Sequence, residues 1–258
     1  MMLASFLFGM LFCWDALSRT DSGKVDQAQE LLSSMLTRSK TINTISLEVV
    51  VEKHPTFKQH TLRMKARFLP DGRCYARMDH YDSDMRQIGS EVVKDDKWDS
   101  IYFKDKTLTR HQLTGNFIRA DLNEMSDSWF PILPLLATNS DYYEKAFKAS
   151  IVQDDKDYIW VRFQPRKQSI RSALVAQIGL IKYPNAVSPA NFPLCLEWID
   201  YSGATKWRIT KVSINEESTV QDSDFSVEVR EYERNGWKTQ RSDGMGFWRW
   251  FKKITVNE

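Results

Sequence analysis

The feature that most constrains the fold of this chain is a hairpin pattern between residues 193 and 214. Two runs rich in Trp, Ile, Val and Thr flank a Ser202-Gly203 turn signal, which is typical of two antiparallel strands. Side chains alternate along a strand, so every second residue of the hairpin lies on the same face. With Ser202-Gly203 as the loop, the predicted pairs on one face are Trp198 with Trp207 and Leu196 with Ile209.

The two faces of this hairpin differ in polarity. Glu197 and Arg208 lie on the face opposite to the four apolar side chains, so we expect that face to be the more solvent-exposed one. The apolar face needs a partner, which is either the protein's own core or a bound hydrophobic molecule.

Short β-type segments separated by turn signals fill residues 41–113. One such signal is Pro70-Asp71-Gly72, and turns recur about every eight to twelve residues. This spacing predicts an antiparallel meander, as in a barrel or a sandwich. The predicted strands are 45–51, 61–69, 73–80, 87–94, 98–103 and 107–113, followed by 149–153, 158–164, 180–183 and 226–233. The stretch 169–178 is ambiguous.

The segment 25–40 has the period of a helix instead. Its apolar side chains at helical spacing are Val25, Ala28, Leu32, Met35 and Leu36. The pattern predicts an amphipathic helix that lies on an apolar surface.

A second interruption of the strand pattern is the apolar segment 116–147. Pro131 and Pro134 exclude one long regular helix, because each proline removes a backbone donor and clashes with the preceding turn. We expect short helical pieces across an opening of the sheet. They would act either as a lid over a ligand or as a plug that completes a dry core.

The first residues, 1–14, are apolar and uncharged, and Ala16-Leu17-Ser18 is similar to a signal-peptide cleavage site. We therefore predict a signal peptide at 1–18, a folded domain at 19–240, and export to the periplasm or cell envelope. The alternative is an apolar first strand or helix of the folded domain. In an exported chain, Cys74 and Cys195 either form a disulfide or remain buried thiols.

The last residues, 241–258, form a basic and aromatic tail. One helical face would carry Phe247, Trp250, Phe251 and Ile254, and the other Arg249, Lys252 and Lys253. This combination is typical of the membrane interface, where aromatic rings bury and cations meet anionic lipid. The alternative is a tail docked on the sheet.

Catalytic and cofactor motifs do not stand out in the sequence. The four histidines are isolated, and we find no nucleophile elbow, P-loop, dinucleotide fingerprint or zinc spacing. Asp79, Asp82 and Asp84 are read as a solvated turn because the glycine and glutamate of a calcium loop are missing. A net charge of +2 argues against nucleic acid as a partner. We therefore predict no enzyme, no cofactor and no metal.

The order of the segments over about 25–229 resembles the LolA/LolB-like family of periplasmic lipoprotein carriers. The resemblance lies in the helix at 24–32, the strand after Thr44, the Pro70-Asp71-Gly72-Arg73 turn with Arg77, the D-x-K-type segment 95–102 ending in Tyr102, the 192–203 hairpin with its D-x-x-G turn, Asn215, and Asp224-Phe225. It covers nearly all of the predicted domain through loose motifs.

This resemblance implies a mainly β (α+β) fold, an unclosed antiparallel half-barrel wrapped around an N-terminal helix and a central helical lid. It implies a hydrophobic cavity for acyl chains, with the family's functional arginine at Arg77. The predicted ligand-binding residues are Arg77, Tyr102, Trp129, Phe130, Ile132, Leu135, Leu196, Trp198, Trp207 and Ile209.

The leading hypothesis is an exported carrier or binding protein that buries the acyl chains of a lipid or lipidated protein. The alternative is a protein-interaction or sensor module of the cell envelope that uses the same fold without lipid. A hydrolase of unrecognised type is a third reading, which the lack of a catalytic constellation disfavours.

Overall fold

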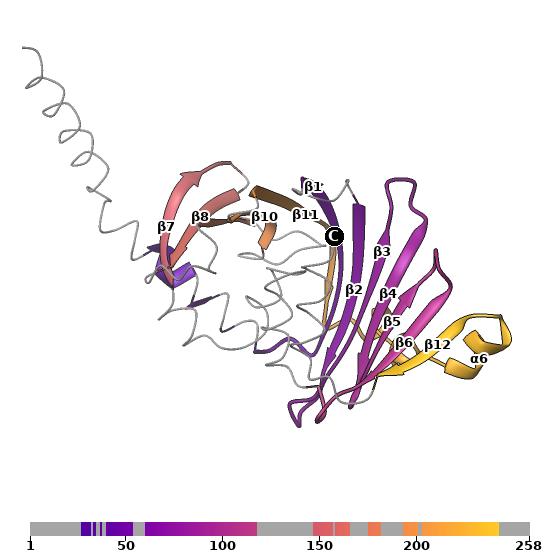
Figure 1. Ribbon diagram of the computed structural model, residues 1–258. Coiled ribbons are helices and arrows are strands. Elements are labelled where there is room, and N and C mark those ends of the chain that lie inside the picture. Colours follow the sequence, from indigo (N-terminus) through magenta and orange to yellow (C-terminus); the bar gives the residue numbers. More distant parts are fainter. Residues whose placement is uncertain are drawn as a thin grey trace, which may run out of the picture.

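The computed structural model describes residues 27–31, 33–34, 37, 40–53, 60–117, 147–156, 158–165, 175–181, 193–200 and 203–242. The strands in this part of the chain form a single 12-stranded sheet (Figure 1). The sheet bends but does not close, so the predicted mainly β fold with an unclosed antiparallel sheet is confirmed.

The strand order is β12-β6-β5-β4-β3-β2-β1-β11-β10-β9-β8-β7, with β12 and β7 at the two edges. Neighbouring strands pair antiparallel, except that β12 runs parallel to β6. The strands are β1 (Thr44–Lys53), β2 (His60–Phe68), β3 (Cys74–Tyr81), β4 (Gln87–Lys94), β5 (Lys97–Tyr102), β6 (Thr107–Gln112), β7 (Phe147–Asp154), β8 (Tyr158–Pro165), β9 (Val175–Ile181), β10 (Pro193–Asp200), β11 (Gly203–Ile214) and β12 (Lys238–Ser242).

The predicted meander over 41–113 is confirmed, and its strand ends lie within two residues of the predicted ones. The Pro70-Asp71-Gly72 turn joins β2 to β3, with Gly72 in the left-handed region at a φ of 86°. That backbone conformation is open to glycine without steric cost. β9 starts earlier than the predicted strand at 180–183 and includes part of the ambiguous stretch.

The prediction of a last strand at 226–233 is wrong. Most of that stretch forms helix α6 (Val229–Arg234), which carries Glu231 in its first turn and Arg234 in its last. The chain leaves the helix through Gly236, whose φ is 75°, and then forms β12, which the sequence pattern did not predict.

The β10–β11 hairpin is confirmed, but its predicted register is not. The observed Cα partners are Leu196 with Trp207, Trp198 with Thr205 and Asp200 with Gly203. The loop therefore lies one residue earlier than the Ser-Gly signal indicated, which moves each partner by two positions. A shift of two preserves the faces, because side chains alternate with period two. β11 also pairs with β1 along its other edge, so the whole sheet sets this ladder.

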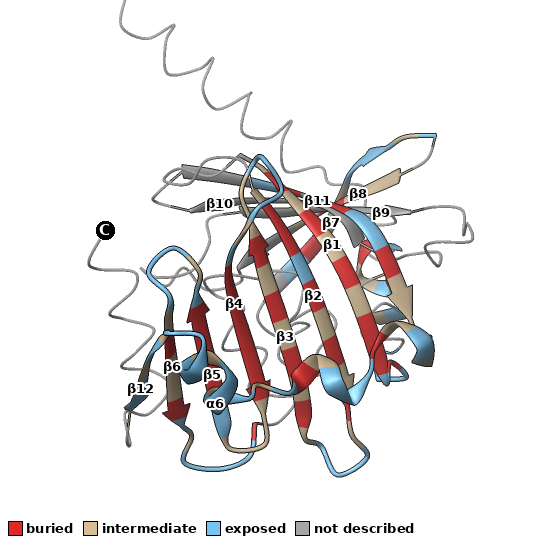
Figure 2. Ribbon diagram, turned by 90° about the vertical axis from the view of Figure 1, so that its right-hand side faces the viewer, coloured by how far each residue is buried: buried red, intermediate tan, exposed pale blue. Residues whose placement is uncertain are grey.

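The two faces of the sheet have different roles. The inner face carries the alternate residues of the buried core, such as Leu47, Met64 and Met78, together with Ala28 of the predicted N-terminal helix. Residues 27–31 are helical, as predicted. The outer face carries polar residues such as Lys65 and Arg77. Figure 2 looks onto this outer face and shows α6 in front of it.

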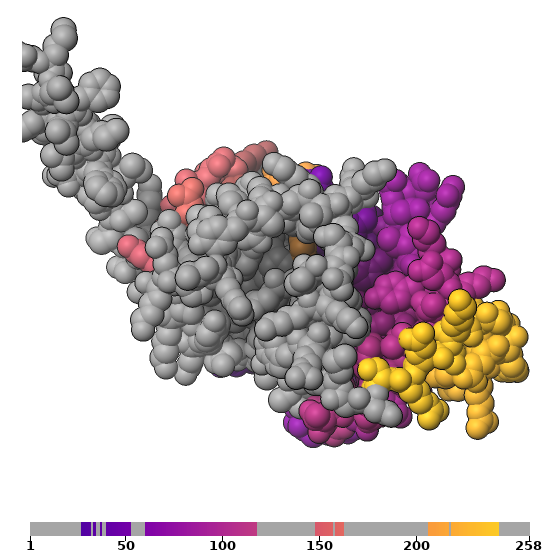
Figure 3. Space-filling view, in the orientation of Figure 1, coloured from indigo at the N-terminus to yellow at the C-terminus, as the bar shows by residue number. Residues whose placement is uncertain are grey.

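The segment 215–237 connects β11 to β12, and we call it the outer strap. It contains the 3-10 turns η1 (Glu217–Thr219) and η2 (Asp222–Phe225) and then α6. Because β11 lies at the centre of the sheet and β12 at its edge, the strap must pass over the intervening strands. In Figure 3 the yellow atoms of α6 and β12 lie next to the magenta atoms of strands β3–β6.

Candidate functional site

An apolar wall on the inner face of β1 and β11 is the centre of the candidate site. The ladder places Val49 opposite Ile209 and Val51 opposite Trp207. Trp207 is 6% exposed and Ile209 is 3% exposed. The structure thus brings these two predicted residues together on one wall, and β2 and β3 extend that wall with further buried apolar side chains.

The wall exists because every second residue of these strands is apolar. In β1 these residues are Ile45, Leu47, Val49 and Val51. Burying one such side chain contributes roughly 1.5–3 kcal/mol. In this structure the wall is covered by the protein's own atoms, since each of these four residues is at most 2% exposed.

A polar patch lies beside the wall, on the inner face of strands β3 to β6. Its members are His80, Glu91, Ser100 and His111, all of them buried. Glu91 stands opposite Met78 on one side and Ser100 on the other, so it faces inward with the core residues. The half-barrel interior is therefore apolar at its centre, and toward the β12 edge it combines these polar groups with apolar residues such as Val93 and Trp98.

Burial shifts the pKa values of two groups in this patch in opposite directions. Desolvation raises the pKa of Glu91 from 4.5 to about 7. Desolvation, followed by repulsion from His60, lowers the pKa of His80 from 6.5 to about 4. At neutral pH His80 is thus uncharged, and Glu91 is divided between its protonated and ionised forms. Stability linked to His80 is lost as the pH falls from 6.5 through 4.

Tyr102 lies at the end of β5, on the same face as the polar patch. Gly89 is its Cα partner on β4, and His80 is the next partner along that row. A side chain at Gly89 would come within 3.3 Å of the Ile101 carbonyl oxygen, so the glycine allows this close approach. Tyr102 is 41% exposed and stands where the inner face meets solvent. Its role in ligand binding stays a prediction.

Arg77 lies on the outer face, opposite to the wall. Its Nε donates to Oδ1 of Asp79 at 3.0 Å, and its Nη1 donates to the carbonyl oxygen of Asp224 at 3.2 Å. The structure does not bring Arg77 together with Trp207 and Ile209. The functional role implied by the resemblance stays a prediction, and the contacts seen here attach the outer strap to β3.

The remaining predicted residues divide into two groups. Leu196 and Trp198 are placed by their strand register alone, opposite Trp207 and Thr205. The predicted lid residues Trp129, Phe130, Ile132 and Leu135 lie outside the described residues, as does the predicted signal peptide. Of the predicted tail, Arg241 and Ser242 belong to β12, and the residues after them are outside the described part.

Cys74 is a fully buried thiol on the inner face of β3. Among the described residues, no group of three His, Cys, Asp or Glu side chains is arranged to hold a metal ion. No helix in the described ranges combines the length and apolar character needed to cross a membrane.

Sequence reasoning missed the polar patch, although a signal for it exists. Gly89, Glu91 and Val93 alternate with Ser90 and Val92, so strand periodicity already places Glu91 on the face of Val93. The patch becomes visible only when the neighbouring strands show that this face is the inner one.

No protein-family model matches the sequence, and no curated protein is significantly similar to it. Solved structures with a similar fold include the Pseudomonas aeruginosa MucA/MucB complex, with a TM-score of 0.46, 12% identity, and coverage of 79% of this chain and 62% of that chain. LprF from Mycobacterium bovis has a TM-score of 0.45 and 11% identity, and the match covers 76% of this chain and 97% of LprF. A putative outer membrane lipoprotein-sorting protein domain from Vibrio parahaemolyticus has a TM-score of 0.38 and 12% identity, and the match covers 81% of this chain and 100% of that chain.

The chain thus spans less than two thirds of the first of these proteins. The fold class itself rests on the strand order and the open edges described above.

Proposed function

We propose that this protein is an exported carrier or binding protein, and that it buries the acyl chains of a lipid or lipidated protein against its inner face. The observation that carries the proposal is the continuous apolar wall of β1, β2, β3 and β11 on the concave side of an open sheet. An open sheet can admit a chain between its edges without breaking strand pairs.

The mechanism is reversible burial of hydrocarbon. Each CH₂ group transferred from water to an apolar surface contributes about 0.8 kcal/mol. Binding needs no catalytic group, and release needs only a competing apolar surface. The polar patch beside the wall suits the polar end of such a ligand, because a pocket of this kind is mostly apolar with a few polar groups that orient the ligand.

The direct test is to look for lipid on the purified full chain by native mass spectrometry and solvent extraction. A stripped sample is then titrated with a fluorescent fatty acid, and we expect saturable binding. Protein that carries no lipid and shows no saturable uptake would contradict the proposal.

A matched pair of variants locates the binding surface. Ala76→Leu enlarges a buried inner-face side chain of β3, whereas Ser46→Leu enlarges a partly exposed outer-face side chain of β1. We expect Ala76→Leu to weaken fatty-acid binding several-fold, because it occupies volume at the wall, and Ser46→Leu to leave it unchanged. Thermal unfolding of both variants shows whether overpacking, which costs about 1–3 kcal/mol, has disturbed the fold.

The alternative is a protein-interaction or sensor module of the cell envelope. It is favoured by the low exposure of the wall residues, which lie under the protein's own atoms in this structure. In that case the wall is a packed core, and stripped protein would exclude the fatty acid while remaining folded.

A further inference from the structure

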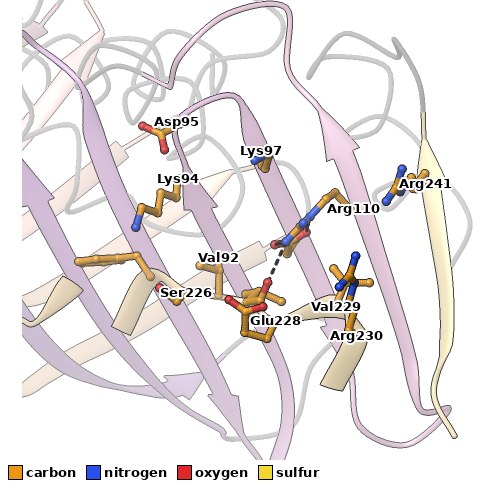
Figure 4. A pocket seen from close by; sticks show the side chains of 13 residues that line it. Val92, Lys94, Asp95, Lys97, Arg110, Ser226, Glu228, Val229, Arg230 and Arg241 are labelled. Atoms are coloured by element: carbon orange, nitrogen blue, oxygen red, sulfur yellow. Dashed lines mark hydrogen bonds and ion pairs between the residues drawn. The ribbon is translucent and has the colours of Figure 1, made fainter. Parts of the chain in front are cut away.

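A pocket of about 470 Å³ lies on the outer face, between the outer strap and strands β4, β5, β6 and β12 (Figure 4). It is separate from the apolar wall, which belongs to the other face of the sheet. Its inner end is apolar, where Val92 and Phe225 are buried. Apart from Ser226, Val227 and Val229 of the strap, the rest of its lining is charged.

The strap is held firmly enough to form one side of this pocket. Lys65 of β2 donates to Asp224 Oδ1 at 2.8 Å. The ring centroids of Phe225 and Tyr75 lie 5.8 Å apart. Arg110 of β6 donates through Nη2 to the carbonyl oxygen of Val227 at 3.1 Å. The strap therefore contacts β2, β3 and β6.

Basic side chains dominate the pocket lining. It contains five of them, Lys94, Lys97, Arg110, Arg230 and Arg241, against the three acids Asp95, Asp99 and Glu228, a net of two positive charges. Figure 4 shows the cations on several sides of the hollow, contributed by β4, β5, β6, α6 and β12.

Two of the three acids are already engaged by other groups. Asp99 accepts two hydrogen bonds from Arg110, at 2.6 Å each. Asp95 accepts from Nη1 of Arg73 at 3.0 Å and from the Tyr75 hydroxyl at 2.9 Å. Their negative charges are therefore satisfied by these partners and do little to balance the other cations.

The sheet register also sets like charges side by side. Lys94 is the Cα partner of Lys97, and Arg241 is the Cα partner of Arg110, whose own charge is paired with Asp99. Like charges opposite each other on neighbouring strands destabilise a sheet. An anion bound between them would remove that repulsion, and Arg and Lys are the side chains that proteins use to hold phosphate.

We propose that this outer pocket binds a phosphate group, carried either by a small soluble molecule or by a lipid headgroup. The site is independent of acyl-chain burial on the inner face, and each can fail without the other. Two exposed cations from different strands, Lys97 and Arg241, are the side chains to test. Arg110 is unsuitable because its pairing with Asp99 is part of the fold.

The test uses the full chain and compares Lys97→Gln/Arg241→Gln with the matched control Lys104→Gln/Lys238→Gln. Both remove two exposed positive charges, but neither control residue lines the pocket. Thermal unfolding is followed against inorganic phosphate and glycerol 3-phosphate, with chloride at equal ionic strength as the reference.

We expect phosphate to raise the melting temperature of the wild type and the control saturably, and the apparent affinity to fall at least tenfold in the pocket variant. Without phosphate the pocket variant should melt no lower than the wild type, since the repulsion has been relieved. No saturable response, or an equal response in all three proteins, would overturn the proposal.

Flotation with vesicles of phosphatidylcholine and phosphatidylglycerol separates the two sources of phosphate. Weaker flotation of the pocket variant than of the control identifies a lipid headgroup as the ligand. Equal flotation, together with a lost response to glycerol 3-phosphate, identifies a soluble phosphate ester. Uptake of the fluorescent fatty acid by the same variants should remain unchanged, which distinguishes failure of this site from failure of the inner face.

Discussion

At the residue scale, Glu91 shows how one buried carboxyl links the stability of this protein to pH. It lies on the inner face of β4, and burial raises its pKa from 4.5 to about 7. Below pH 4.5 the carboxyl is protonated in both the folded and the unfolded chain. As the pH rises from 4.5 to 7 the unfolded chain ionises first, so the folded state loses stability.

The variant Glu91→Gln removes this titration. Because the shift corresponds to about 3 kcal/mol, we expect the variant to gain about that much unfolding free energy over the wild type between pH 4 and pH 8. Urea unfolding at both pH values measures the gain. The exposed Glu216→Gln is the control, and a Glu91→Gln effect that is the same at both pH values would contradict the expected burial.

Asn215 is a second residue whose single side chain stabilises the fold. Its φ of 57° is left-handed, a region that asparagine tolerates better than most residues. Its Oδ1 accepts from the backbone N–H groups of Asn43 (2.7 Å) and Thr44 (3.2 Å), and its Nδ2 donates to the Thr41 carbonyl at 3.0 Å. Asn215 therefore ties the end of β11 to the start of β1.

We expect Asn215→Ala to cost about 2–4 kcal/mol of unfolding free energy, from lost hydrogen bonds and left-handed strain. Asn215→Gly loses the same hydrogen bonds but adopts the left-handed backbone freely, so its cost should be smaller. Urea unfolding of the two variants separates these causes. An alanine variant within 0.5 kcal/mol of the wild type, on the order of measurement error, would show that the link is unimportant.

At the element scale, the outer strap depends on a small second core. Phe225, Val92 and Val220 are buried together, and Tyr75 packs against them. Ion pairs such as Arg67–Asp222 surround this cluster, but the Asp222 side chain is 75% exposed. Exposed pairs contribute about 0–1 kcal/mol, so we expect the apolar contacts to stabilise the strap more than this ion pair does.

Replacing Phe225 by alanine tests this order of importance. We expect Phe225→Ala to cost about 3–5 kcal/mol locally, because it empties a buried aromatic site. Hydrogen exchange of the strap amides should accelerate, and Asp222→Ala should change it by less than tenfold. Similar exchange in the two variants would mean that the ion pairs, and not the apolar contacts, attach the strap.

At the scale of the whole molecule, the described sheet is complete at Ser242, where β12 ends. A chain that stops there should melt at the temperature of the full chain and bind anionic vesicles less, if residues 243–258 form the predicted interfacial tail. Calorimetry and vesicle flotation measure the two effects. The full-length protein with Phe247, Trp250 and Phe251 changed to Ser keeps the chain length, and we expect it to float less as well. Flotation of both variants equal to that of the wild type would contradict the prediction.

Local sequence patterns determined the strand segments of this protein and the polarity of their faces. Alternation placed Trp207 and Ile209 on an apolar face, and Pro70-Asp71-Gly72 marked a turn, because both signals depend only on neighbouring residues. The same reasoning failed at 226–233, where a strand was predicted and most of the stretch forms a short helix. The open half-barrel was expected from a family resemblance, which supplies long-range order that local patterns lack.

Only the tertiary structure decided which segments became neighbours. The pairing of β1 with β11, the parallel addition of β12 to β6, and the hairpin register join residues far apart in the sequence. Those pairings place Arg77 on the outer face, bury Glu91, and bring Arg110 beside Arg241. The physical reason is that strands pair through backbone groups that every residue carries, so the local sequence does not specify which strand becomes the neighbour.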